Sequence, residues 1–217
     1  MHDSADAGRE RQLHDALASG LNAAGRTLDA DMRRRLVQFV LLLARWNAVY
    51  NLTAVREPLG MVSRHLLDSL AIETYLQGTR IIDVGTGAGL PGIPLAVVRP
   101  DCQFALLDAN SKKTRFVTQA AAELGLKNVA VVHSRVEDYR PAQSFDTVVT
   151  RAYAKVATML GQTAHLGGPN CIYLAMKGAS PVGERDGVPA DFVVQGIEKL
   201  VIPGLNAERH VVIVRRR

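Results

Sequence analysis

The sequence is poor in cysteine and in aromatic residues, and it has no long hydrophobic run. Only two cysteines occur among 217 residues, Cys102 and Cys171, and their separation fits no metal site. We therefore expect two buried free thiols and no bound metal. The longest apolar run, residues 36–44, is far shorter than the roughly 20 residues of a membrane-spanning helix. The polar N-terminus does not look like a signal peptide, so we expect a cytoplasmic protein without a membrane partner.

The positive charge of the chain is modest and unevenly placed. The formal net charge is +5, from 26 Lys/Arg and 21 Asp/Glu. Residues 1–79 hold nine of each kind, so the whole excess lies in residues 80–217 and includes the terminal Arg215, Arg216 and Arg217. A basic balance is compatible with a nucleic-acid partner, because neutralised phosphates supply much of that affinity. Many soluble proteins are equally basic, so the charge alone does not decide the partner.

Residues 1–79 have the pattern of helices. Apolar side chains recur at steps of three and four, at Leu36, Val40, Leu43, Trp46 and Tyr50. This spacing predicts a helix over residues 29–50 with a buried stripe. We expect Trp46 to belong to the core rather than to stack on a base. A second helix is predicted to begin near Pro58, because proline is favoured at the first helical position.

From Arg80 onward, predicted strands alternate with helices, which is typical of a parallel sheet with crossovers. The predicted strands cover residues 80–84, 103–107, 130–133, 147–150 and 171–176. A helix is predicted over residues 111–124, capped by Ser111 and followed by Gly125. Residues 192–202 and 210–214 predict an antiparallel pair at one edge. The fold class is α/β, with a helical cap (1–79) packed on a doubly wound sheet domain (80–217) as one compact unit.

A glycine-rich loop follows the first predicted strand, where the chain reads RIIDVGTGAGLPG from residue 80 to residue 92. It contains a literal G-x-G-x-x-G, the spacing of a dinucleotide-binding turn, at Gly87, Gly89 and Gly92. The strand ends at Val84, however, so the first tight turn is Gly85-Thr86-Gly87. A nicotinamide turn in that register needs glycine at position 90, where the chain has Leu90. The literal match is therefore out of register.

Asp83, one residue before the end of this strand, separates the cofactor classes. A carboxylate suits a ligand with a cationic amino group and is a poor neighbour for a pyrophosphate. S-adenosylmethionine carries an ammonium, a sulfonium and a ribose, and the pattern D-x-G-x-G-x-G from Asp83 to Gly89 fits the class I methyltransferases that bind it. Asp108 ends the next strand, where an acid accepts hydrogen bonds from ribose hydroxyls. We therefore expect a class I, Rossmann-like methyltransferase with S-adenosylhomocysteine as its product.

The residues at the ends of the third and fourth strands indicate adenine contacts and limit which atom accepts the methyl group. Val136 and Glu137 follow the third strand and are candidates for contacts with the adenine. The fourth strand ends in TRAY, residues 150–153, without the Asn/Asp-Pro-Pro-aromatic stretch of enzymes that methylate exocyclic amines. Both cysteines lie at strand starts, which argues against a cytosine C5 enzyme. An acceptor that loses no proton during attack remains: guanine N7, a carboxylate or a thiol.

Arg151, at the carboxyl end of the fourth strand, is the candidate catalytic residue. We expect it to act by positioning and electrostatics, holding either the carboxylate of the cofactor or a phosphate of the substrate. The alternative is a plain surface salt bridge.

Seven segments, taken together, resemble one family. They are RWNAVYNLTAVR (45–56), RHLLDSL (64–70), DVGTGAGLPGIPLA (83–96), SRVED (134–138), TRAYA (150–154), KG (177–178) and ERHVVIV (208–214). In this order they are similar to the bacterial small-subunit ribosomal RNA guanine-N7 methyltransferases, also called the glucose-inhibited division protein B family. The resemblance implies methylation of N7 of one guanine in 16S ribosomal RNA, with that RNA or the small subunit as partner. It also implies S-adenosylmethionine contacts at Gly85, Leu90, Val136, Glu137 and Arg151, and a ribose contact at Asp108.

Two polar groups are candidates for contact with the RNA. Arg64, His65 and Asp68 share one helical face by the i, i+3 and i+4 rule, and we expect this face to border the mouth of the active site. The alternative is that a His–Asp pair fixes the helix to the sheet. The second group opens the helix that follows the second strand: Lys112, Lys113 and Arg115. It forms either a patch for RNA phosphates or a solvated face.

Two other functions compete with the methyltransferase interpretation. A nicotinamide-dependent oxidoreductase is supported only by the out-of-register glycine match and is opposed by Asp83. A non-catalytic RNA-binding module with a retained cofactor pocket is opposed by the intact set of acids and glycines. The sequence shows no strong apolar patch that demands a dimer, so we expect a monomer.

Overall fold

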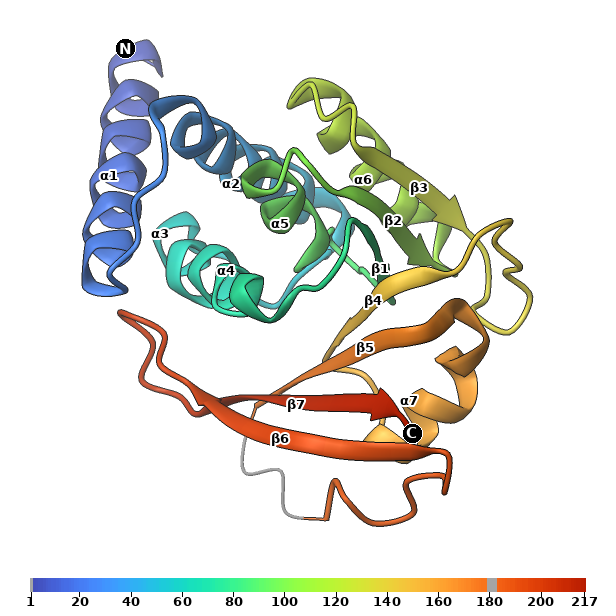
Figure 1. Cartoon of the computed structure of the whole chain (residues 1–217). Coiled ribbons are helices and arrows are strands. Elements are labelled where there is room, and N and C mark those ends of the chain that lie inside the picture. The colour runs from blue at the N-terminus through green and yellow to red at the C-terminus, as the bar shows by residue number, and fades with distance from the viewer. Residues whose placement is uncertain (1, 179–182) are drawn as a thin grey trace.

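The computed structural model describes residues 2–178 and 183–217, and within them seven strands form one sheet (Figure 1). The strands are β1 (Arg80–Val84), β2 (Gln103–Asp108), β3 (Val129–His133), β4 (Phe145–Arg151), β5 (Gly167–Lys177), β6 (Phe192–Leu200) and β7 (Arg209–Arg216). Their order is β3-β2-β1-β4-β5-β7-β6. Strands β1 to β5 run parallel to one another, whereas β7 is antiparallel to both β5 and β6. The predicted α/β fold and its antiparallel edge pair are thus confirmed.

The helices divide unequally between the two faces of the sheet (Figure 1). One face is covered by α1 (His2–Ala23), α2 (Ala30–Tyr50), α3 (Pro58–Met61), α4 (Asp68–Leu70), α5 (Gly92–Val98) and α6 (Ser111–Glu123). On the other face, α7 (Val156–Thr163) packs against the sheet. Because side chains alternate along a strand, the neighbours Ile81 and Ile82 are both fully buried but belong to the two different cores.

The helical layer before β1 packs directly on the sheet. Asp29 caps α2 by accepting a 2.7 Å hydrogen bond from the amide of Met32, and Pro58 is the first residue of α3, as predicted. Leu36, Val40 and Leu43 are fully buried, as the stripe predicts. Their cluster continues into β1, β2 and β4, so helices and strands share one core.

Two details of the helical layer differ from the sequence prediction. Tyr50 was expected in the buried stripe but is 48% exposed, because α2 ends there and Asn51 turns the chain with a left-handed φ of 51°. The chain after α3 is a π-helix, Val62–Leu67, followed by the short α4 and a 3₁₀ turn, Glu73–Tyr75. The predicted single second helix is therefore three consecutive helical pieces.

β1 covers its predicted residues, β6 ends two residues before its predicted end, and the other strands extend one to four residues beyond the prediction at an end. The four residues added at the start of β5 are not buried, so an apolar pattern could not reveal them. The helix α6 is capped by Asn110 rather than by Ser111: the Asn110 side chain accepts from the amides of Lys112, at 2.9 Å, and Lys113. Gly125, with a φ of +64°, follows this helix as predicted. Across the described residues, no helix is long and apolar enough to cross a membrane.

Candidate S-adenosylmethionine site

The glycine loop connects the end of β1 to α5 at the carboxyl edge of the sheet. Gly85, Gly87 and Gly89 have φ values of +71°, +60° and +76°, which side chains rarely adopt. The amides of Gly85 and Thr86 donate to the Leu107 carbonyl of β2 at 2.8 and 3.0 Å. The loop is therefore held against the end of the next strand, where open α/β sheets bind their ligands.

Asp83 has one buried carboxylate oxygen without a hydrogen-bond partner among the described residues. Its side chain is buried, and Oδ2 accepts from Thr86 Oγ1 at 2.7 Å and from the Gly92 amide at 2.9 Å. Among the described residues, Oδ1 has no hydrogen-bond partner. Burial raises the pKa of Asp83 from 3.8 to about 6, although both hydrogen bonds oppose the change. A buried, unpaired oxygen of this kind fits the ammonium group of a cofactor.

Asp108, at the end of β2, borders the other side of the loop. Its Oδ2 accepts from the Gly87 amide at 2.9 Å, and its Oδ1 accepts from the Asn110 amide at 2.8 Å. Lys113 Nζ lies 4.0 Å from the same carboxylate. Lys113 therefore faces the loop. Its neighbour Lys112, from the same basic group predicted to contact RNA, is exposed instead.

The remaining predicted cofactor residues differ in exposure. Leu90 is 5% exposed and packs into the core under the helical layer. Val136 is buried in the opposite core, and Glu137 is exposed and accepts from Gln162 Nε2 at 3.1 Å. Tyr153 was not predicted as a site residue: a Cβ added to Gly85 would lie 3.4 Å from its ring. Its place two residues after Arg151 is the signal that could have identified it.

Arg151, Asp68 and Arg209 form a network at the carboxyl ends of β4 and β5. Arg151 Nη1 donates to Asp68 Oδ2 at 3.1 Å, and Arg209 Nε donates to Asp68 Oδ1 at 2.9 Å. Burial raises the pKa of Asp68, and the two guanidinium groups oppose that rise. Arg209 was missed by sequence reasoning because it lies 141 positions from Asp68.

His65 joins the same network from the π-helix. Its Nδ1 lies 3.4 Å from Arg151 Nη2, and its Nε2 lies 2.9 Å from Thr53 Oγ1. Burial, and then the charge of Arg151, lower its pKa to about 4, so the ring is neutral near neutral pH. Among the described residues, His65 and Asp68 share no hydrogen bond; both lie next to Arg151, so the alternative of a direct His–Asp pair is not supported.

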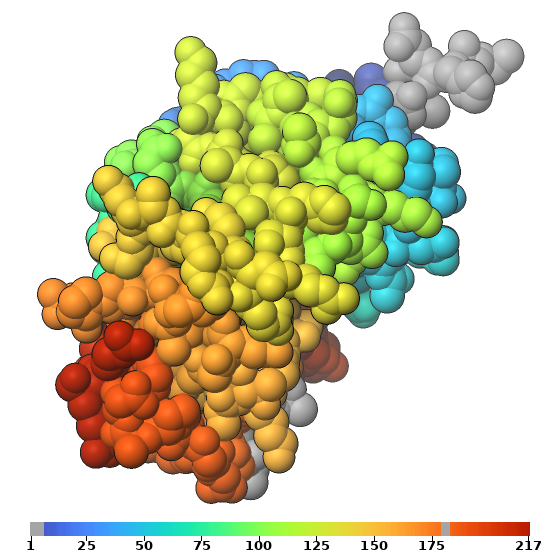
Figure 2. Space-filling view, turned by 90° about the vertical axis from the view of Figure 1, so that its right-hand side faces the viewer, coloured from blue at the N-terminus to red at the C-terminus, as the bar shows by residue number. Residues whose placement is uncertain are grey.

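Of the residues expected to contact RNA, those on the surface remain candidates. Arg64, Lys112 and Arg115 are exposed, whereas His65 is 3% exposed and offers no surface. Figure 2 shows α6 (green to yellow-green) beside the segment that follows β3 (yellow) on one face of the molecule. His65, on the π-helix, lies next to Arg151 of β4 and not at the surface.

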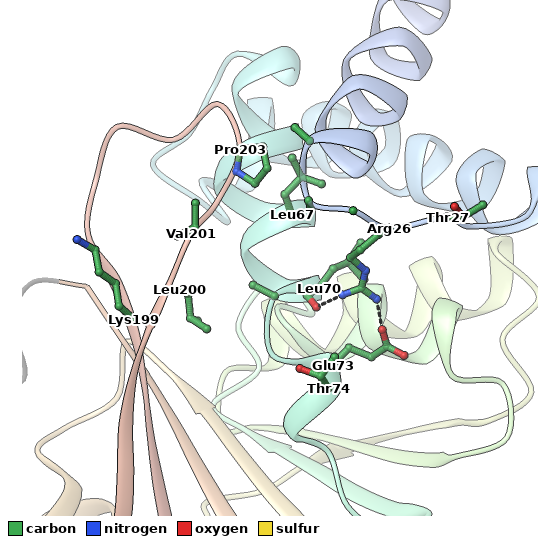
Figure 3. Close-up of a pocket in the computed structure, with 14 residues that line it drawn as sticks. Arg26, Thr27, Leu67, Leu70, Glu73, Thr74, Lys199, Leu200, Val201 and Pro203 are labelled. Carbon is green, nitrogen blue, oxygen red and sulfur yellow. Dashed lines mark hydrogen bonds and ion pairs between the residues drawn. The ribbon is translucent and has the colours of Figure 1, made fainter.

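The molecule has one cavity next to the Arg151 network and another away from it. A cavity of about 540 Å³ adjoins the network and is lined by residues 151–155 and 176–178 with Asp68, Glu184 and Arg209. A cavity of about 670 Å³ lies between the end of α1, the Glu73–Tyr75 turn and β6 (Figure 3). Of the predicted cofactor residues, Arg151 lines the first cavity and none lines the second.

Comparisons with known proteins agree with this geometry. The sequence matches the rRNA small subunit methyltransferase G (GidB) family over residues 32–212. The chain belongs to this family. It is 50% identical to ribosomal RNA small subunit methyltransferase G of Nitrosococcus oceani over 93% of this chain and 94% of the relative. The protein of the same name from Pseudomonas aeruginosa is 49% identical over 93% and 95%.

Solved structures share the fold at low sequence identity. An S-adenosylmethionine-dependent methyltransferase from Aquifex aeolicus has a TM-score of 0.54 at 18% identity, covering 69% of this chain and 90% of that one. A methyltransferase from Thiobacillus denitrificans, solved with S-adenosylhomocysteine, has a TM-score of 0.50 at 14% identity, covering 70% and 90%. The class I fold, the family and the assignment as a cofactor-dependent rRNA methyltransferase are confirmed, and the oxidoreductase alternative has no support.

Proposed function

We propose that the chain transfers the methyl group of S-adenosylmethionine to N7 of one guanine in 16S ribosomal RNA. The observation that carries the proposal is the unpartnered Oδ1 of Asp83, buried beside a loop of three left-handed glycines. Membership of the rRNA small subunit methyltransferase G family supports the RNA substrate. The choice of guanine N7 comes from the family and agrees with the elimination of other acceptors.

Different residues of the site would bind different parts of the cofactor. Asp83 would bind its ammonium group and Asp108 its ribose hydroxyls, and the segment from Val136 to Glu137 would border the adenine. Arg151 would hold its carboxylate, because its positive charge lies close enough to lower the pKa of Asp83. These contacts would fix the direction in which the reactive methyl group points.

The reaction needs little acid–base chemistry from the protein. Bound S-adenosylmethionine supplies an electrophilic methyl group on a positively charged sulfur. With that group bound, the lone pair of N7 would take the methyl group as the S–C bond breaks, and the positive charge would pass from sulfur to the guanine ring. Because N7 carries no proton, no general base is required. The chain would contribute alignment, exclusion of water and electrostatic stabilisation.

On the RNA side, we propose that Arg64, Lys112 and Arg115 contact backbone phosphates, since all three are exposed. Lys113, which faces Asp108, would act mainly on the glycine loop. We further propose that the protein acts as a monomer in the cytoplasm, where small ribosomal subunits are found. Light scattering with and without cofactor would test the monomer.

The experiment that tests the function is transfer of a labelled methyl group to RNA that lacks the modification. Free 16S ribosomal RNA and small subunits are offered in parallel, and the product is treated for cleavage specific to N7-methylguanine. Label at one cleavable guanine supports the proposal and shows which substrate form is used. Label that resists this cleavage, or no label with protein that binds S-adenosylhomocysteine, would contradict it.

A further inference from the structure

Asp68 is shared by two arginines from strands that are not neighbours in the sheet. Arg151 is the last residue of β4 and Arg209 the first residue of β7, and β5 lies between these strands. Each arginine binds a different carboxylate oxygen, at 3.1 and 2.9 Å. The Asp68 side chain is only 4% exposed. One carboxylate of the helical layer thus fixes two cationic side chains at the edge of the candidate site.

We propose that Asp68 is a positioning residue for Arg151, holding its guanidinium where it meets the carboxylate of S-adenosylmethionine. The inference rests on the proposed role of Arg151 in cofactor binding. Asp68 itself would not bind the carboxylate of the cofactor, because two carboxylates repel each other; each of its oxygens instead accepts from an arginine.

The geometry of Arg151 supports a positioning role. A free arginine side chain samples many rotamers, and fixing them costs conformational entropy. Asp68 accepts from Nη1, and His65 lies 3.4 Å from Nη2, so two neighbours already fix the plane of the guanidinium. Since a guanidinium has five N–H donors, others remain for a ligand. Arg151 also lines the cavity next to the network, where such a ligand would meet it.

The charges of the network favour an anion. Asp68 neutralises only one of its two arginines, and His65 is neutral because its pKa is lowered to about 4. Arg209 occupies the second oxygen of Asp68, which keeps that carboxylate from turning toward other donors. The charges of Asp68, Arg151 and Arg209 therefore sum to one positive charge, and the charge of Arg151 is also felt by Asp83 in the glycine loop. A positive sum suits a carboxylate ligand.

The competing explanation is that Asp68 only ties the helical layer to the sheet. The chain offers a matched control for this explanation at the second cavity. There, Glu73 forms an ion pair with Arg26, and Figure 3 shows Arg26 directed toward Glu73 and the Leu70 carbonyl. This pair ties the same helical segment to the turn after α1. It is partly buried but contributes nothing to the cofactor loop.

The test measures binding by calorimetry of two ligands that differ in the amino-acid part. S-adenosylhomocysteine carries the carboxylate and 5′-methylthioadenosine does not. We expect Asp68→Asn and Arg151→Gln each to weaken the binding of S-adenosylhomocysteine about 10-fold or more, since a hydrogen bond to a charged group contributes about 1.5–3 kcal/mol. The double variant should lose no more than Arg151→Gln alone, and methylthioadenosine should bind all variants equally.

The control variant separates positioning from tethering. Glu73→Gln should lower the melting temperature but leave both affinities unchanged. Asp68→Glu keeps the charge that both arginines need, so this variant should fold. It should selectively weaken the binding of S-adenosylhomocysteine, because the carboxylate of the new side chain is displaced by one methylene. This variant carries the test if Asp68→Asn does not fold.

Three results would overturn the inference. They are unchanged S-adenosylhomocysteine affinity in the Asp68 variants, equal loss of both ligands, and additive losses in the double variant. The proposed function fails differently: the wild-type protein would then not bind S-adenosylhomocysteine, or would bind it and methylate no RNA.

Discussion

Replacing Asp83 is predicted to stabilise the free protein while abolishing its affinity for the cofactor. In the free protein the ionised carboxylate is buried without a counter-ion on Oδ1. Its pKa of about 6 lies above the ordinary value of 3.8. The folded state therefore binds a proton more tightly than the unfolded state does, and the ionised form lowers the free energy of unfolding.

The magnitude follows from the size of this shift. A change of roughly 2 pKa units corresponds to about 3 kcal/mol at about 1.4 kcal/mol per unit. Below about pH 4 the carboxyl is protonated in both states and contributes no penalty. As the pH rises from about 4 to about 6, the penalty develops, and above about pH 6 it is complete. Asp83→Asn removes it, because an amide stays neutral and still accepts from Thr86 and Gly92.

The assay is urea and thermal unfolding of wild-type protein and Asp83→Asn at about pH 4 and about pH 8. The variant should be more stable at the higher pH by up to about 3 kcal/mol, which is about 6–12 °C for a chain of this size. At the lower pH the difference should nearly vanish. S-adenosylhomocysteine should raise the melting temperature of the wild type only.

Asp108→Asn provides the matched control for this prediction. Both oxygens of Asp108 accept backbone amides, at 2.9 and 2.8 Å, so an amide in its place loses one favourable contact. This variant should be less stable than the wild type at both pH values. If Asp83→Asn destabilised the protein at about pH 8, or if the variant still bound S-adenosylhomocysteine normally, the reasoning about Asp83 would be refuted.

Three further predictions concern packing, thiol reactivity and RNA. Gly92→Ala should lower the free energy of unfolding, measured by urea titration, by about 1–3 kcal/mol, because the added methyl group would lie 2.1 Å from the buried Leu106 of β2. Gly161→Ala should raise it by about 0.5–1 kcal/mol, because open space surrounds this position of α7. Cys171, whose pKa burial raises to about 12, should resist alkylation at about pH 8 until the protein is unfolded, as mass spectrometry would show. Arg64→Ala and Lys112→Ala should each weaken RNA binding and lower its salt dependence by about one unit, with unchanged affinity for S-adenosylhomocysteine; unchanged RNA binding in both would exclude this placement of the RNA.

The approximate positions of the strands and the register of the glycine loop could be predicted because both depend on local sequence. The run from Arg80 to Val84 is apolar and short, and the glycines that follow it have the positive φ values that a tight turn requires. The predicted acid positions also depend only on where strands end. Asp83 and Asp108 consequently lie on either side of the loop, as the sequence predicts.

The network around Arg151 could not be predicted in the same way. Asp68 and Arg151 are 83 positions apart, and nothing in local periodicity pairs them. The helical-face argument placed His65 and Asp68 together but assumed a regular α-helix. The π-helix from Val62 to Leu67 changes the angle between successive side chains, and both polar residues are buried against the sheet.

Errors at the ends of elements have a similar physical origin. Asn110 caps α6, although Ser111 is equally suited by residue type, because the chain turns one residue earlier. Tyr50 is exposed because α2 ends beside solvent, which its spacing cannot show. Lys113 faces the loop while Lys112 does not, since they are neighbours on different sides of one helix.

A crystal structure of the protein with S-adenosylhomocysteine tests the central claim most directly. We predict that the amino group of the ligand lies within hydrogen-bond distance of Asp83 Oδ1, that its ribose hydroxyls contact Asp108, and that its carboxylate meets Arg151 while Asp68 keeps both arginines. A ligand bound elsewhere, or bound at the glycine loop with Asp83 Oδ1 still unpartnered, would contradict this account of the site.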